Sequence, residues 1–107
     1  MLAVEQLERL ARRAGLGLAR TGSVAHHGSG EIFLAFSVAG RRPRGAGATA
    51  PGHPEGALND VFTAAVEATE AAVLNCLWAA PDVAGRDGRS TPGLPHERVL
   101  DLLGRGH

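Results

Sequence analysis

The run Gly28–Ser37 places a glycine–serine turn directly in front of a strongly apolar segment. Gly-Ser-Gly lets the backbone approach another group closely, because glycine has no Cβ atom. The residues that follow are rich in β-branched and aromatic side chains, which predicts a strand over residues 31–38. This strand is apolar on both faces except at Glu31 and Ser37. Such a pattern is typical of a strand covered on both sides, so we expect the chain to be part of a layered fold.

Ser29 and Glu31 are the candidate chemical groups of this segment. Side chains alternate between the two faces of a strand. If Ser29 is already extended, its hydroxyl shares a face with the Glu31 carboxylate, and the other face carries Ile32, Leu34, Phe36 and Val38. This arrangement would suit the rim of an active site. Short glycine–serine turns are common, however, and the pattern by itself is also compatible with an ordinary turn.

Composition restricts the class of protein. A chain of 107 residues suggests one domain or part of one, residues 1–107. Its 11 basic and 11 acidic residues balance, which argues against nucleic acid as a partner. A single cysteine, Cys76, suits the cytoplasm and, inside an apolar helix, is expected to be buried rather than nucleophilic. No uninterrupted run of 18 or more apolar residues is present, which predicts no membrane span. The first residues do not have the pattern of a signal peptide.

The pattern of apolar residues predicts the order helix, strand, strand, helix, helix, an α/β arrangement. The first helix spans about residues 4–14 and is ended by Gly15 and Gly17. A strand over 16–25 would then pair with 31–38 as a hairpin. A long helix is expected from Asn59 or Asp60 to about residue 80, a turn at 85–88, and a short helix over 94–104 that Gly104 ends.

A loop over residues 39–57 is rich in Gly, Pro, Ala and Arg, and we expect it to be flexible. This loop contains Arg41, Arg42 and Arg44. Such a cluster is compatible with binding of an anion, with binding of a partner's acidic patch, and with simple exposure to solvent. Glu67 and Glu70 on the long helix are spaced so that they could act in general acid–base catalysis, but this spacing is also typical of a solvated helix face.

The five histidines do not form a metal-binding pattern. His26 and His27 are adjacent, so they point in opposite directions and do not chelate together, and no Cys pair or acid cluster accompanies them. We therefore expect no metal and no cofactor. His27 is a possible general base for Ser29, although no Gly-x-Ser-x-Gly elbow is present.

Five segments of the chain follow one another as QLERLARRAGLGLARTGS, SGEIFLAFSVA, NDVFTAAVEATEAAVLNCLWAA, GRDG and LPHERVLDLL. Together they resemble, in order and spacing, the C-terminal part of the L-aminopeptidase/D-esterase family, which includes the DmpA-type β-peptidyl aminopeptidases. The resemblance covers nearly all of this chain and about the last third of a family member.

The resemblance implies a serine aminopeptidase that releases N-terminal residues from peptides, amides and esters. In this family a precursor cuts itself before a serine, which becomes the N-terminal nucleophile of the β chain. The fold is a four-layer αββα sandwich (DmpA/ArgJ-like), and cleaved αβ pairs assemble as oligomers. By the motif match, Ser29 is the second active-site serine and Glu31 the acid two residues later. Both support the nucleophile.

The chain also departs from the family pattern. Met1 stands where the end of the nucleophile strand would be, and neither Ser23 nor Ser37 takes the nucleophile position. The oxyanion and substrate-pocket residues belong to the family's α chain. A segment before Gly85 that is often threonine-rich reads Pro81-Asp82-Val83-Ala84 here. We therefore expect a C-terminal fragment or subunit whose partner is the rest of the peptidase. The alternative is a non-catalytic remnant that serves as an interaction or structural subunit.

Overall fold

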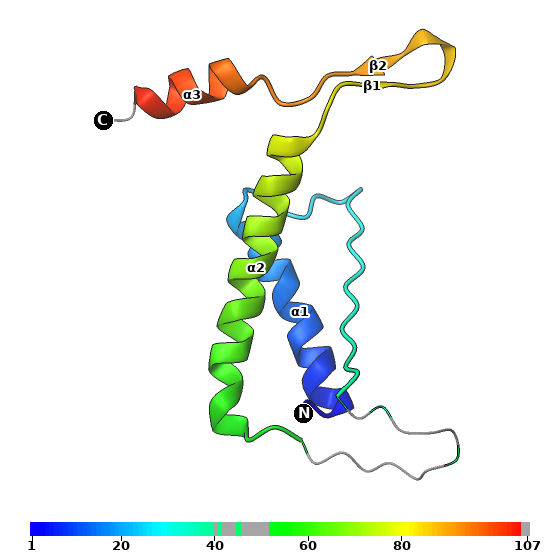
Figure 1. The fold of residues 1–107 in the computed structure, drawn as a ribbon, viewed down its shortest axis with the longest axis vertical. Helices are drawn as coiled ribbons and strands as arrows, with labels where there is room; N and C mark the ends of the chain where they lie inside the picture. The colour runs from blue at the N-terminus through cyan, green and yellow to red at the C-terminus, as the bar shows by residue number, and fades with distance from the viewer. Residues whose placement is uncertain (40, 42–44, 46–51, 106–107) are drawn as a thin grey trace. The chain divides into compact units, whose positions relative to one another are not determined.

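The computed structural model describes residues 1–39, 41, 45 and 52–105. They belong to two compact units, Met1–Glu70 and Ala71–His107, which are described separately below. Whether the whole chain acts as one domain stays a prediction. Figure 1 shows the order of the elements: α1 (Val4–Arg20), η1 (Glu55–Ala57), α2 (Leu58–Ala79), β1 (Val83–Ala84), η2 (Arg86–Gly88), β2 (Ser90–Thr91) and α3 (His96–Gly104).

Helix α1 is longer than its sequence pattern predicts. It continues through Gly15 and Gly17 and ends only at Arg20, where the Thr21 hydroxyl donates to the Leu18 carbonyl at 2.7 Å. Gly22 follows with φ +99°, a left-handed conformation that glycine adopts without strain. The predicted strand over 16–25 is therefore wrong, and so is the hairpin that depended on it. A Cβ atom at Gly17 would overlap α2, whereas one at Gly15 would lie at ordinary contact distance from the Phe33 ring.

The segment 31–38 is extended and runs alongside α1 (Figure 1). Within the described part of the chain, no strand pairs with it, so it is extended backbone rather than part of a sheet. The Phe33 ring contacts α1 near Gly15. The opposite face is open: Ile32 is 96% exposed and Leu34 84%. A segment that is apolar on both faces thus has cover on only one of them.

The core of the first unit lies between α1 and the first part of α2. Leu58 is 1% exposed and Phe62 is 9% exposed. The guanidinium carbon of Arg13 lies 4.1 Å from the centroid of the Phe62 ring, a cation–π contact that covers this small core from the α1 side. Few other large apolar side chains of this unit are buried, so its core is small.

The predicted loop 39–57 ends earlier than expected. Residues 55–57 form the single turn η1, and α2 begins directly after it at Leu58. Contacts with α1, described below, hold residues 53 and 55 in place. Arg42 and Arg44 lie outside the described residues, so the role of the arginine cluster that begins at Arg41 stays open.

Together η1 and α2 form a continuous helical stretch, Glu55–Ala79, that is long and apolar enough to cross a membrane by length and composition alone. The sequence pattern had predicted no such span. The core helix of a soluble protein passes the same test.

Cys76 on α2 is exposed, contrary to expectation.

The second unit contains a short antiparallel hairpin. β1 and β2 pair Val83 with Thr91 and Ala84 with Ser90. The turn between them lies at the predicted Gly-Arg-Asp-Gly, with Asp87 at φ 59° and Gly88 at φ 73°. After the hairpin, the His96 ring stacks on Trp78 with centroids 4.2 Å apart and hydrogen-bonds to the Trp78 carbonyl at 2.7 Å. This contact caps the last turn of α2 with the first residue of α3.

Candidate active site

The connection between α1 and the extended segment determines where the candidate pair lies. After Gly22 the chain adopts a second left-handed residue, Ala25, at φ 47°. The Ser29 N–H then donates to the His26 carbonyl at 2.7 Å, which closes a tight turn. This turn ends at Ser29, two residues before the extended segment 31–38, so Ser29 is held close to the start of that segment.

Ser29 and Glu31 lie together as the alternation of the segment predicts. The Ser29 hydroxyl donates to Oε1 of Glu31 at 2.5 Å, and both residues are exposed. A hydroxyl bonded to a carboxylate is a unit that can accept or relay a proton from a neighbouring group. The geometry agrees with the predicted pairing, whereas the catalytic role of the two residues stays a prediction.

Glu31 also lines a small hollow of about 90 Å³ next to α1. The other residues that line it are mostly small or apolar: Gly15, Leu18, Ala19, Ser23, Ala25 and Phe33. Glu31, an exposed residue, therefore lies beside the surface of α1.

The other candidate groups are not brought to this pair. Among the described residues, no hydrogen bond joins the His27 ring to Ser29, so the structure gives no support to a histidine base. Glu70, a possible acid–base group by sequence, pairs with Arg20 at 2.9 Å and holds α2 to the end of α1. Within the described ranges, no group of three or more His, Cys, Asp or Glu side chains could hold a metal ion.

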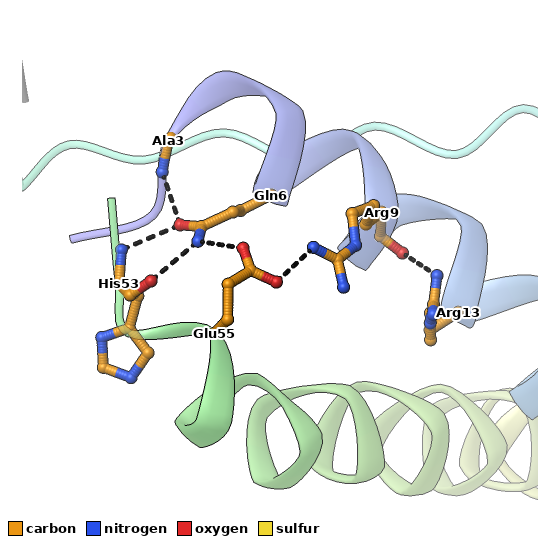
Figure 2. A network of polar contacts seen from close by, with 6 residues as sticks. All are labelled: Ala3, Gln6, Arg9, Arg13, His53 and Glu55. Atoms are coloured by element: carbon orange, nitrogen blue, oxygen red, sulfur yellow. Dashed lines mark hydrogen bonds and ion pairs between the residues drawn. The ribbon is translucent and has the colours of Figure 1, made fainter. Parts of the chain in front are cut away.

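A polar cluster around Gln6 was not predicted from the sequence. Figure 2 shows the Gln6 amide between the start of α1 and the segment that leads into α2. Its oxygen accepts from the backbone N–H groups of Ala3 at 3.0 Å and His53 at 2.9 Å. Its nitrogen donates to the His53 carbonyl at 2.8 Å and to Oε1 of Glu55 at 3.0 Å. Gln6 is 6% exposed, and all four of these hydrogen bonds stabilise its buried amide.

Glu55 completes this cluster. Its second carboxylate oxygen accepts from Arg9 at 2.8 Å. The hydrogen bond from Arg9, followed by that from Gln6, lowers the pKa of Glu55 below its ordinary value of 4.5. The sequence around Gln6 does not predict this cluster, because His53 lies 47 residues away and only the tertiary structure brings the two together.

Comparison with known proteins decides the family. Residues 1–91 match the model of peptidase family S58. The chain belongs to this peptidase family. The resemblance found in the sequence is thereby confirmed.

Two curated relatives are the beta-peptidyl aminopeptidases BapA of Sphingosinicella. The protein from S. microcystinivorans is 39% identical over 101 residues, which are 92% of this chain and 26% of the relative. The protein from S. xenopeptidilytica is 37% identical over 102 residues, again 92% of this chain and 25% of the relative. The chain thus spans about a quarter of the length of these relatives.

Two solved structures are also similar. The PH0078 protein from Pyrococcus horikoshii OT3 matches 99% of this chain and 31% of its own, with a TM-score of 0.87 and 38% identity. The L-aminopeptidase D-Ala-esterase/amidase from Ochrobactrum anthropi matches 97% of this chain and 30% of its own, with a TM-score of 0.85 and 35% identity. The latter is described as a prototype for the serine aminopeptidases and a variant of the Ntn hydrolase fold. This supports an α/β class of Ntn type, and the four-layer sandwich stays a prediction.

Proposed function

We propose that this chain provides the supporting residues of the active site of a serine aminopeptidase. The observation that carries the proposal is the hydrogen bond from the Ser29 hydroxyl to Glu31, found in a chain of peptidase family S58. The proposed reaction is hydrolysis of N-terminal residues from peptides, amides or esters. It needs no cofactor.

The chemistry follows from the weakness of a serine nucleophile. A hydroxyl attacks a carbonyl only when a base removes its proton. A free α-amino group, with an ordinary pKa near 8, can act as that base for an N-terminal serine. Ser29 and Glu31 would orient this amino group and stabilise its positive charge once it is protonated.

The nucleophile and the oxyanion donors would come from a further segment of the peptidase. Among residues 1–107, the resemblance matches no serine to the nucleophile. The proposed partner is therefore the α chain together with the nucleophile strand, in an oligomer located in the cytoplasm. The chain by itself is expected to release no p-nitroaniline from aminoacyl anilides, because loss of the nucleophile removes the covalent step.

A graft tests the proposal. Residues 1–107 replace the matching segment of BapA from S. microcystinivorans, and release of p-nitroaniline from an aminoacyl anilide is measured. We expect activity in the graft, with Ser29→Ala and Glu31→Gln each lowering kcat by about 10²–10⁴. Ser37→Ala, on the same segment and outside the pair, is the control and should leave kcat unchanged. A folded graft without activity, or one that keeps its activity in Ser29→Ala, would contradict the proposal.

The exposed apolar face of residues 31–38 favours a second candidate, a non-catalytic subunit that binds the rest of a peptidase through this face. In that case the chain would bind a co-expressed partner segment, but Ser29→Ala and Glu31→Gln would leave the activity of the complex unchanged. The same variants therefore distinguish the two functions.

A further inference from the structure

Gly15 and Gly17 lie on opposite faces of α1. An α-helix turns by about 100° per residue, so two residues separated by one other are about 200° apart around the axis. Glycine in the interior of a helix is unfavourable relative to alanine. The two glycines in Gly15-Leu16-Gly17 therefore raise the question of what lies against each face of this turn.

The Gly17 face contacts α2 directly. A Cβ atom at this position would lie 2.5 Å from the Val66 carbonyl oxygen and 2.6 Å from Cβ of Thr69. No side chain fits between the two helix backbones there. Gly17 thus fixes the distance of α1 from α2 within the first unit.

The Gly15 face contacts the extended segment. A Cβ atom at Gly15 would lie 3.4 Å from Cε2 and 3.7 Å from Cζ of the Phe33 ring. Phe33 is 38% exposed, the least among the large apolar residues of its segment, because its ring lies against this turn. A methyl group at position 15 would fit against the ring, whereas a longer side chain that extends from it toward Phe33 would displace the ring.

Glu31 lies on the same side of the segment as Phe33. Both residues line the hollow of about 90 Å³ together with Gly15, Leu18 and Ala19 of α1. Because Glu31 and Phe33 are two residues apart on one extended segment, we expect a displacement of Phe33 from α1 to displace Glu31 and the Ser29 hydroxyl bonded to it.

We propose that Gly15, through its contact with the Phe33 ring, is a positioning residue for the Ser29–Glu31 pair. Helix α1 acts as a spacer, with α2 held at Gly17 and the segment that carries Glu31 held at Gly15. The catalytic consequence rests on the proposed function, whereas the positioning itself is tested without catalysis.

The test uses nuclear Overhauser effects in the labelled 107-residue chain, at a concentration low enough to limit the self-association expected from its exposed apolar face. The wild type should show contacts between Hα of Gly15 and the Phe33 ring, and between Hγ of Glu31 and the methyl groups of Leu18 or Ala19. Gly15→Leu should lose the Glu31 contacts while the helical signal in far-UV circular dichroism stays the same or rises, since leucine favours a helix. Gly15→Ala should keep them, because its methyl group makes only an ordinary contact with the ring.

Two further variants and one kinetic readout separate positioning from a general effect on folding. Phe33→Ala leaves α1 intact and should also lose the Glu31 contacts, whereas Glu5→Leu, an exposed position on α1, should keep them. In the BapA graft, Gly15→Leu should lower kcat by about a hundredfold with a much smaller change in KM, because the supporting pair is misplaced while the substrate pocket is untouched.

Absence of the Gly15–Phe33 contact in the wild type, or Glu31 contacts that persist in Gly15→Leu, would overturn the inference. An inactive graft whose chain keeps all these contacts would instead count against the proposed function alone.

Discussion

Gln6 is a buried side chain that joins two distant parts of the sequence. Its amide joins the first turn of α1 to residues 53 and 55, just before α2. A single buried side chain thus fixes the position of two helix starts. A polar group in this place is stable only because each of its hydrogen-bonding atoms has a partner.

Replacing Gln6 by leucine should destabilise the fold by about 1–3 kcal/mol, because the backbone groups of Ala3 and His53 lose their partners. Urea unfolding followed by circular dichroism measures the change. Glu5→Leu adds the same side chain at an exposed neighbouring position and should stay within about 0.5 kcal/mol of the wild type. Equal stability of the two variants would show that the amide cluster contributes nothing.

Glu55 makes the stability depend on pH. Hydrogen bonds from Arg9 and Gln6 lower its pKa in the folded state below 4.5. Its contribution is therefore fully present above the unfolded value and is lost as the pH falls through the lower folded value. The urea midpoint of the wild type should exceed that of Glu55→Gln at neutral pH, and the difference should shrink below pH 4.5. A difference that stays constant down to pH 3, or grows on acidification, would contradict this sign.

At the scale of the elements, the packing of α1 on α2 depends on Gly17. Alanine would favour the helix by about 0.5–1 kcal/mol, but its methyl group would overlap the α2 backbone. Overpacking of this kind costs about 1–3 kcal/mol, so Gly17→Ala should be destabilising overall.

Gly15→Ala is the matched control, two residues away in the same helix. Its methyl group meets only the edge of the Phe33 ring, at ordinary contact distance. Because alanine also favours the helix, we expect the free energy of unfolding to stay the same or to rise slightly. Thermal melts of the two variants, run side by side, test the ranking. A Gly17→Ala variant as stable as Gly15→Ala would show that the two helices are not held at this point.

At the scale of the whole molecule, the chain exposes an apolar row that ordinary domains bury. Ile32, Leu34, Phe36 and Val38 are 69–96% exposed on one face of the extended segment. Burial of three or four such side chains contributes roughly 1.5–3 kcal/mol each, against a typical total stability of about 5–15 kcal/mol. A chain without this cover therefore lacks a large part of the free energy of unfolding that an ordinary domain has.

The isolated chain should therefore associate with itself or depend on a partner. Light scattering should show species larger than the monomer, and the thermal transition should be broad. Replacement of Leu34 and Phe36 by threonine should reduce the association, because it removes apolar surface and keeps strand propensity. A monodisperse monomer with a sharp melt above about 60 °C would show that the chain is a self-sufficient domain.

The sequence by itself determined the features that depend on neighbouring residues. The spacing of apolar residues predicted a long helix close to the observed α2, Leu58–Ala79, and Gly-Arg-Asp-Gly predicted the turn at 85–88. Ser29 and Glu31 were expected on the same side because they are two residues apart, and their hydrogen bond agrees. The ordered segments also indicated the family that the comparisons confirm.

The tertiary structure decided what depends on distant residues. Gly15 and Gly17 suggested a helix end, but contacts with Phe33 and with the α2 backbone outweigh the unfavourable propensity of glycine, and α1 continues to Arg20. The Gln6 cluster joins groups 47 residues apart, which no local pattern encodes. The helix propensity of glycine is only about 1 kcal/mol less favourable than that of alanine, so packing between distant segments outweighs it in α1.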